Sequence, residues 1–122
     1  MAKIVDPSRE IDVWEVYDAF TGAEIQGLEA LGLARPGTAA RDVEAGRFDR
    51  GGACPVNLSG GLIGQGGAPG AVGVAQAVTI MRLLQGRYFP ELQPKVLPRI
   101  GVADAHGGMC AVSVTHTFER LD

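Results

Sequence analysis

Nine of the chain's 18 glycines fall between Gly51 and Gly73, and this stretch limits the possible folds more than any other feature. Glycine accepts positive φ angles and lets other backbone approach closely, so such a density predicts tight turns packed against a neighbouring element. The stretch lacks both the strict period of collagen and the monotony of a linker. We therefore expect these glycines to shape loops inside a single folded domain of 122 residues.

Composition excludes several classes of protein. A hydrophobic fraction of 46% with a net charge of −3 argues against both intrinsic disorder and an electrostatic nucleic-acid binder. No apolar run approaches the ~20 residues that cross a bilayer. Cys54 and Cys110 are too few for a disulfide framework, and no signal peptide is visible, so we expect a reduced, cytoplasmic protein.

The first part of the chain predicts a strand followed by a helix. Residues Ile11–Phe20 are rich in β-branched and aromatic side chains. Thr21 and Glu24 have the spacing of a capping box, and the helix should end near Gly32 to Gly37. Residues 38–50 carry mixed charge and are expected to form a solvated helix turn or loop.

The second part predicts a helix followed by a hairpin. From Ala71 onward apolar residues recur at helical spacing, and Gly86 fits the position just after the helix. The expected buried stripe is Ala71, Val74, Ala75, Val78, Met81 and Leu84, with Gln76, Thr79 and Arg82 off it. Lys95–Val102 and Met109–Phe118 predict two strands joined by a loop at residues 104–108. This element order favours an α/β layered fold.

Known nucleotide and metal motifs are absent from the sequence. The run Gly64–Pro69 fails the dinucleotide fingerprint, and no Gly-Lys-Ser/Thr follows it. The histidines and cysteines form no closely spaced pair that could begin a metal site. We predict no metal, and the glycine-rich stretch either packs beneath a helix or receives an acyl or thioester carrier.

Two side chains are candidates for chemistry. Tyr17 follows the first predicted strand, where α/β proteins place functional groups, although a packed tyrosine with its hydroxyl at the rim is the alternative. His106, in a predicted glycine-flanked loop, is a better candidate than His116, which falls in an apolar strand. Cys110 is near His106 in sequence, but we expect it to be buried and inert.

Four ordered motifs resemble the C-terminal half of the thiolase superfamily, especially its sterol-carrier-protein-X type and its acetyl-CoA acetyltransferase-like members. They are Ile11–Thr21, Pro55–Gly61, Gly64–Gly73 and His106-Gly107-Gly108. The resemblance implies an α/β fold with layered helices on a mixed five-stranded sheet. It also implies that residues 1–122 form one domain and that the N-terminal half, which carries the family's nucleophilic cysteine, is absent.

The resemblance assigns roles residue by residue. Tyr17 stands where family members have an Asn or His that holds a catalytic water or oxyanion, and a tyrosine here is similar to thiolase-derived aldolases. Gly67 replaces the histidine of the family's Gly-His-Pro motif. The second active-site cysteine, or its Asn substitute, falls near Ala105 rather than Cys110. The loop expected near substrate and coenzyme A comprises Asn57, Gly60, Gly61, Gly66, Gly67 and Gly70.

These departures favour a retro-aldol reaction over ordinary thiolase chemistry. Claisen-type cleavage needs a base for a thiol and an oxyanion donor, whereas a retro-aldol needs proton removal from a hydroxyl and a stabilised enolate. Tyr17 and His106 would be the acid/base groups. The expected substrate is a β-keto or β-hydroxy acyl-CoA, with no bound cofactor.

We expect the chain to act in a complex. A lone half would expose apolar surface that the other half covers, so the expected partner carries the N-terminal half, and an OB-fold/zinc-ribbon protein is a further candidate. Two other hypotheses stay open: a non-catalytic scaffold domain, and a module that binds coenzyme A or an acyl chain without turnover.

Overall fold

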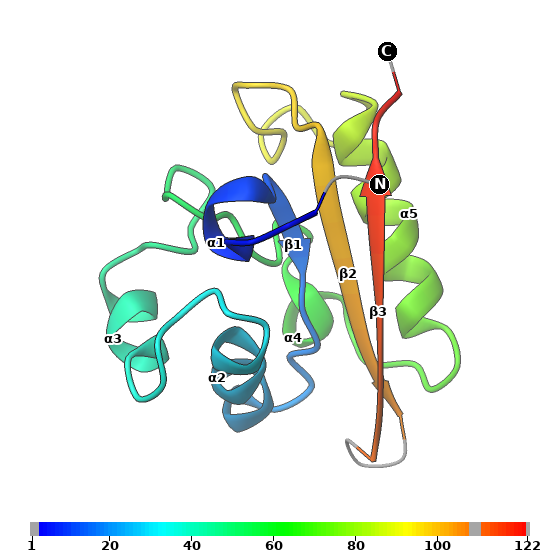
Figure 1. The fold of residues 1–122 in the computed structure, drawn as a ribbon. Coiled ribbons are helices and arrows are strands. Elements are labelled where there is room, and N and C mark those ends of the chain that lie inside the picture. The colour runs from blue at the N-terminus through cyan, green and yellow to red at the C-terminus, as the bar shows by residue number, and fades with distance from the viewer. Residues whose placement is uncertain (1–2, 108–110, 122) are drawn as a thin grey trace.

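The computed structural model describes residues 3–107 and 111–121 and shows a mixed sheet with helices on both faces (Figure 1). Its strands are β1 (Val13–Glu15), β2 (Ile100–Gly107) and β3 (Val112–Glu119), in the spatial order β1-β2-β3. β1 runs parallel to β2, and β2 is antiparallel to β3. The register places Asp104 opposite Thr115 and His106 opposite Ser113. Because alternate residues of a strand share a face, these four side chains lie on the same side of the sheet.

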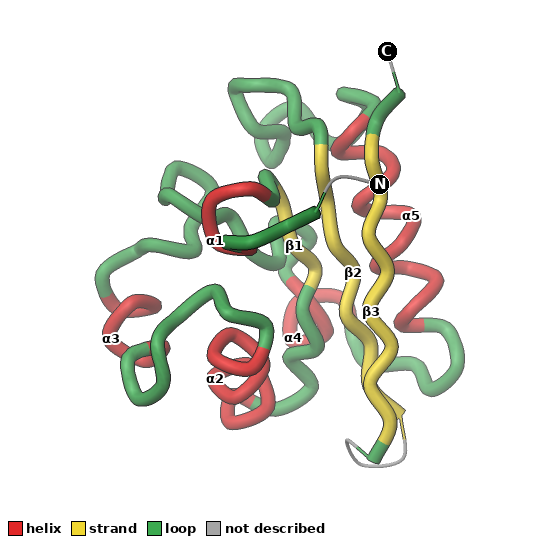
Figure 2. Tube along the Cα trace, viewed as in Figure 1, coloured by secondary structure: helices red, strands yellow, loops and turns green. Residues whose placement is uncertain are grey.

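The helices divide between the two faces of the sheet. They are α1 (Pro7–Glu10), α2 (Thr21–Ala30), α3 (Ala39–Glu44), α4 (Gly61–Gln65) and α5 (Val72–Leu84). Figures 1 and 2 show α1, α2 and α3 on one side of the strands and α5 on the other. In residues 3–107 and 111–121, no helix has the length and apolar character needed to span a membrane.

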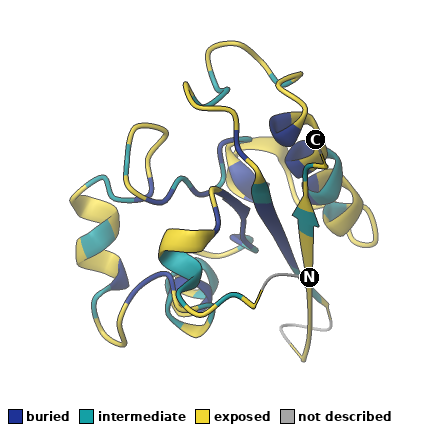
Figure 3. Cartoon of the chain, turned by 45° about the horizontal axis from the view of Figure 1, so that its top comes forward, coloured by how far each residue is buried: buried dark blue, intermediate teal, exposed yellow. Residues whose placement is uncertain are grey.

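Each face of the sheet has its own core. The core toward α2 contains Ile11, Trp14, Val16, Leu28, Leu33, Ala34, Ala39, Phe48, Cys54, Val56 and Val102. The core toward α5 contains Val13, Leu58, Ile80, Leu83, Leu84 and Ala103. β1 is buried and so is half of β2, while β3 is exposed along most of its length (Figure 3). The α/β class predicted from the sequence is confirmed.

The expected five-stranded sheet is wrong for the described residues, which contain three strands. Val56 lies beside β1 but forms only a single bridge, to Trp14. Asn57, the next residue, has a φ of 51°, so the chain turns away immediately and cannot extend the ladder. The predicted strand at Ile11–Phe20 is likewise reduced to the three residues of β1.

The capping box predicted at Thr21 and Glu24 is also wrong. The N-cap of α2 is Phe20, whose side chain makes no capping hydrogen bond, and Thr21 is already helical. Glu24 contacts the Asn57 side-chain amide instead, at 3.4 Å. The predicted end of this helix is confirmed, because α2 stops at Ala30.

Of the buried stripe predicted for α5, Leu84 is confirmed, but most of the stripe is wrong. The buried residues of this helix are Gln76, Thr79, Ile80, Leu83 and Leu84. Val74 and Met81, expected in the core, are 65% and 42% exposed. Gln76 is buried because its side-chain amide donates to the carbonyl of Asp104, which joins α5 to β2. The predicted helix end is confirmed, since Gly86 follows the C-cap with a φ of 66°.

The first strand of the predicted hairpin is shifted along the chain. We predicted a strand at Lys95–Val102 and a loop from residue 104, but β2 begins at Ile100 and continues to Gly107. Pro94 and Pro98 lack the amide hydrogen that a strand ladder needs, which explains the late start. The antiparallel pairing of the two strands is confirmed.

Candidate functional site

An open cavity of about 690 Å³ lies at the end of the sheet where β1 and β2 finish. Tyr17, two residues after the end of β1, and His106, near the end of β2, both line it. Its remaining lining is mostly apolar or glycine: Ala19, Phe20, Leu62, Gly67, Pro69, Gly70, Val72, Gly73, Ala105, Gly107, Val112 and Val114. An apolar cavity with a few converging polar groups is the usual form of a site for a small organic ligand.

Tyr17 and His106 lie face to face in the wall of this cavity. Their ring centroids are 4.8 Å apart with an interplanar angle of 24°. The stack fixes both rings relative to each other, because parallel offset rings attract beyond their buried area. The structure therefore brings together the two residues proposed from the sequence as acid/base groups, and it places His106 in β2 rather than in the predicted loop.

The buried carboxylate of Asp104 supports His106 from within the sheet. Asp104 is 1% exposed, and its Oδ2 lies 2.9 Å from Nε2 of His106. Its Oδ1 accepts hydrogen bonds from the hydroxyls of Ser113, at 2.9 Å, and Thr115, at 3.0 Å. A smaller recess of about 360 Å³, lined partly by α2, meets His106 and Asp104 on this side. His106 thus lies between two openings.

The glycine-rich loop is held in place by Asp18. Asp18 Oδ1 accepts the amide hydrogen of Leu62 at 2.7 Å. A side chain from the segment that follows β1 therefore caps helix α4. Gly61, with a φ of 60°, leaves room for this carboxylate, because a Cβ there would lie 1.9 Å from Asp18 Oδ2. Tyr17 and the glycine loop are therefore positioned by the same contact.

The glycine loop presents free backbone to the cavity. Gly67 and Gly70 line it, and their amide groups donate no hydrogen bond to another described residue. Unpaired amide groups in a cavity wall can donate to an oxyanion that forms during a reaction. Gly67 contributes no side chain at the position where the resemblance implies a histidine.

The other loop residues predicted near the substrate have different positions. Gly61 and Gly66 line a small recess of about 20 Å³ with Glu15 and Gln76. Gly60, with a φ of 90°, is the N-cap of α4. Asn57 acts in the scaffold, since its Oδ1 accepts the amide hydrogen of Val16 at 2.8 Å.

Glu15 is a buried acid that the sequence alone does not single out. It is 1% exposed and bonds to the amide and hydroxyl of Ser59, on the loop before α4. Burial raises the pKa of Glu15 to about 7, and the charge of Asp18 adds to this effect while the Ser59 hydrogen bonds oppose it. The sequence alone does not single out Asp104 either, although it stands two residues before His106 and so shares its face in any strand.

The described cysteine and the second histidine lie away from this chemistry. Cys54 is buried in the core toward α2, and burial raises the pKa of its thiol to about 11, so it is neutral near pH 7. Cys110 lies outside the described residues. His116 is exposed on β3. The described residues contain no group of three or more potential metal-binding side chains.

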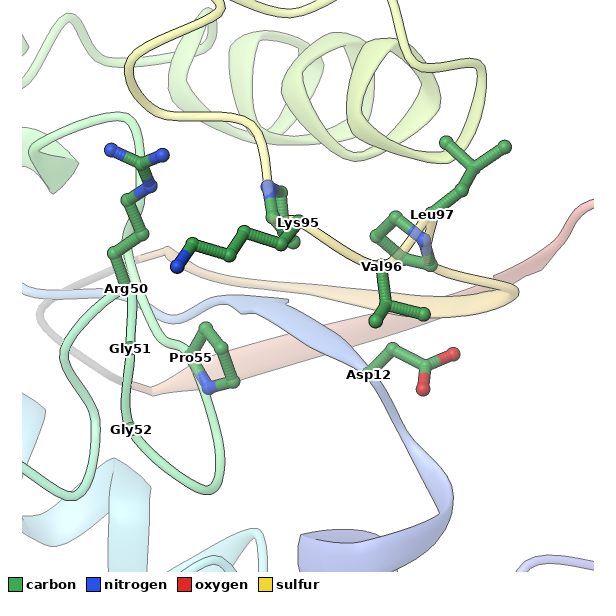
Figure 4. Close-up of a pocket in the computed structure, with 10 residues that line it drawn as sticks. Asp12, Arg50, Gly51, Gly52, Pro55, Lys95, Val96 and Leu97 are labelled. Carbon is green, nitrogen blue, oxygen red and sulfur yellow. The ribbon is translucent and has the colours of Figure 1, made fainter.

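A second cavity, of about 610 Å³, opens at the opposite end of the strands (Figure 4). Arg50 and Lys95 approach it from two separate loops, and Asp12 and Val96 line its floor. The Asp12 carboxylate accepts the amide hydrogens of Arg99 and Ile100, so its role is to hold the start of β2. None of the site residues predicted from the sequence lines this cavity.

Comparisons with known proteins point to one family. Residues 1–120 match the family described as thiolase C-terminal domain-like. The chain is 32% identical over 101 residues to benzoylsuccinyl-CoA thiolase subunit BbsB of Thauera aromatica, covering 83% of this chain and 26% of that protein. It is 38% identical over 100 residues to sterol carrier protein 2 of Bos taurus, covering 79% of this chain and 18% of that protein.

A solved structure agrees with these sequence relatives. The structure described as the Ltp2-ChsH2(DUF35) aldolase superposes with a TM-score of 0.68 and 27% identity, covering 82% of this chain and 24% of that chain. The chain therefore spans about a quarter or less of the length of the proteins it matches.

Proposed function

The chain belongs to the thiolase C-terminal domain-like family, and on that basis we propose that it is one part of an enzyme that cleaves or forms a carbon–carbon bond in an acyl-CoA thioester. We infer that the reaction is the retro-aldol cleavage of a β-hydroxy acyl-CoA. The observation that carries this inference is the Tyr17–His106 stack in the wall of a largely apolar cavity.

The residues that line the cavity support a retro-aldol step. A base removes the proton of the β-hydroxyl, the bond between Cα and Cβ breaks, and its electron pair passes into the thioester as an enolate. The carbonyl product then leaves, and an acid returns a proton to Cα. Tyr17 and His106 are the proposed acid/base groups, and the amides of Gly67 and Gly70, which line the same cavity and have no described acceptor, are the proposed donors to the enolate oxygen.

Thiolytic cleavage fits the same cavity less well. It needs a base for the thiol of the nucleophilic cysteine, which the resemblance places in the N-terminal half, and a donor to the oxyanion. At the position of the family's motif histidine, Gly67 offers backbone alone.

A partner that supplies the N-terminal half of the subunit is part of the proposal. The chain spans at most 26% of the relatives named above, and one of them is itself described as a subunit. Apolar side chains on the outer side of α5 are exposed, including Val74 and Met81. An OB-fold/zinc-ribbon protein is the second proposed partner.

The test begins with the complex and proceeds to activity. Native mass spectrometry of the untagged chain from its own cells should show a bound protein of the size of a thiolase N-terminal half. The pair should cleave a β-hydroxy acyl-CoA, and Tyr17→Phe should lower the rate by about 10²–10⁴ because the ring stack persists while the hydroxyl is lost.

The matched control is Tyr88→Phe, which removes the only other tyrosine hydroxyl, beside the core toward α5. Its rate should equal that of the wild type. Full activity in Tyr17→Phe and in His106→Gln would contradict the proposal and favour the non-catalytic scaffold. Stabilisation by coenzyme A without any turnover would instead favour a binding module.

A further inference from the structure

Asp104 has a buried carboxyl group to which the proposed reaction assigns no role. Its side chain faces the same side of β2 as His106, and the backbone carbonyl of Asp104 accepts the Gln76 side-chain amide at 2.9 Å. A carboxylate that is 1% exposed costs free energy unless hydrogen bonds compensate it. The Ser113 and Thr115 hydroxyls compensate Oδ1, which leaves Oδ2 directed to His106.

We propose that Asp104 is the positioning residue of His106. Its carboxylate holds Nε2 of the imidazole, fixes the ring in one tautomer, and keeps it flat against Tyr17. This inference rests on the proposed function, because it explains how His106 is prepared for proton transfer. Asp104 itself lines the smaller recess, beside α2, and is absent from the lining of the larger cavity that holds Tyr17.

The geometry supports a fixed tautomer. Apart from the 2.9 Å contact with Nε2, Oδ2 has no partner among the described residues. The two atoms are in contact at 2.9 Å, but their alignment is not that of a formed hydrogen bond. Such contacts often tighten only when substrate binds. With the proton on Nε2, Nδ1 becomes the nitrogen that accepts a proton.

Nδ1 of His106 is correspondingly free. It is buried and has no hydrogen-bond partner in the part of the chain that the structure describes. A buried ring nitrogen without a partner is costly, and with the proton on Nε2 this nitrogen is an acceptor that no described group satisfies. Tyr17 covers one face of the ring, and Asp104 holds the opposite nitrogen, so the imidazole has little freedom to turn away.

The two hydroxyls on β3 complete the arrangement. Ser113 and Thr115 stand opposite His106 and Asp104 in the strand register, and both donate to the same carboxylate oxygen. They fix the carboxylate rotamer so that the second oxygen faces the imidazole. Asp104 on β2 and Ser113 and Thr115 on β3 thus hold His106 from one face of the sheet.

Nitrogen-15 NMR of the full 122-residue chain tests the proposal without any substrate. The wild type should show a downfield ring proton bound to Nε2 of His106, protected from exchange by the carboxylate. In Asp104→Asn this resonance should move upfield or vanish through exchange, while the signals of exposed His116 stay unchanged. Asp49→Asn, at an exposed aspartate in the loop after α3, is the matched control and should leave the resonance in place.

A second variant guards against misfolding of Asp104→Asn. Ser113→Ala combined with Thr115→Val keeps the carboxylate but frees its rotamer, so the protected ring proton should broaden or exchange faster. A proton on Nδ1 instead of Nε2 in the wild type would overturn the proposal. So would a ring signal that neither variant changes.

Activity distinguishes this proposal from the proposed function. In the complex, Asp104→Asn should lower kcat by about 10- to 100-fold with little change in KM, because orientation of the base matters in the transition state. If the ring proton depends on Asp104 but Tyr17→Phe retains full activity, the proposed function fails while the positioning contact stands. If Tyr17→Phe is inactive but Asp104→Asn is fully active, the positioning role fails alone.

Discussion

Gly61 is the residue on which the shape of the glycine loop most depends. Its φ of 60° belongs to the left-handed region, and the space its side chain would occupy is filled by the Asp18 carboxylate. That carboxylate accepts the Leu62 amide hydrogen at the start of α4. Because Gly61 has no side chain, Asp18, in the segment after β1, can contact the loop beside the cavity.

We predict that Gly61→Ala destabilises the fold by about 1–3 kcal/mol, because it adds backbone strain and displaces Asp18 from α4. The matched control is Gly64→Ala in the same helix, where the structure shows nothing within 4 Å of the added Cβ. Urea unfolding of the two variants measures the difference. Equal stabilities would show that Asp18 can move without cost.

Glu15 makes stability depend on pH. Burial raises the pKa of its carboxyl from the ordinary 4.5 to about 7, so between these values the folded state binds more protons than the unfolded state. Stability from this group is therefore complete below pH 4.5 and is lost as pH rises through about 7. The partly buried Glu24, whose pKa is also raised by burial, acts in the same direction. Glu29 acts in the opposite direction, because hydrogen bonds from the Gly37 and Ala39 amides lower its pKa.

We predict that Glu15→Gln removes much of this pH dependence, on the order of 3 kcal/mol between pH 4 and pH 8. Glutamine keeps the shape and can still bond to Ser59, so packing should be preserved. Urea midpoints across this pH range provide the measurement, with Glu24→Gln as the control that retains the Glu15 contribution. Parallel pH curves for the wild type and Glu15→Gln would refute the assignment.

At the scale of elements, Gly101 sets the distance between α5 and the sheet. A Cβ there would lie 2.6 Å from Ile80 Cγ2 on α5 and 3.1 Å from Val13 Cγ2 on β1. The absence of a side chain lets the branched side chain of Ile80 reach the backbone of β2. Since α5 follows the glycine loop, this contact also fixes the cavity wall.

Gly101→Ala should cost about 1–3 kcal/mol, because the added methyl group overpacks the layer between α5 and β2. Ile80→Ala alone should also destabilise, by about 2–5 kcal/mol through a cavity. The double variant should lose clearly less than the sum of the two, since each change relieves the other. Denaturant unfolding of all four proteins completes the cycle, and strictly additive losses would argue against the contact.

Some elements could be predicted from the sequence, and others could not, for identifiable reasons. The apolar run of α5, its glycine stop and the terminal hairpin follow from local patterns. The buried face of α5 does not, because Gln76 is polar and its burial depends on the distant Asp104 carbonyl. The start of β2 depends on the Asp12 carboxylate, which lies far away in sequence.

Part of the candidate site could be predicted from the sequence, and part could not. Tyr17 stands after a short strand and before a helix, which is the kind of position where functional side chains gather, and the structure places it against His106. Asp104 is not predicted as a site residue because the sequence predicts a loop at residues 104–108. In a loop, two residues that are two positions apart need not share a face. Once β2 is extended to Gly107, the shared face follows directly.

At the scale of the whole molecule, the outward side of α5 exposes apolar side chains that a partner protein would bury. Val74 is 65% and Met81 is 42% exposed, although the helix is apolar over most of its length. Helices α1 to α3 cover the opposite face of the sheet, as Figure 1 shows. The proposed N-terminal-half partner would cover the exposed side of α5.

We predict that Val74→Lys combined with Met81→Lys weakens binding of that partner by at least about 100-fold, because burying unpaired charge in an interface costs several kcal/mol. The fold should tolerate both changes within about 0.5 kcal/mol, since both side chains face outward. Val43→Lys is the matched control: it lies on α3, on the other side of the sheet, and is 43% exposed. Native mass spectrometry over a concentration series measures association, and urea unfolding measures stability. Unchanged association in the double variant would mean that the partner binds elsewhere, whereas equal losses in Val43→Lys would mean that charge alone is responsible.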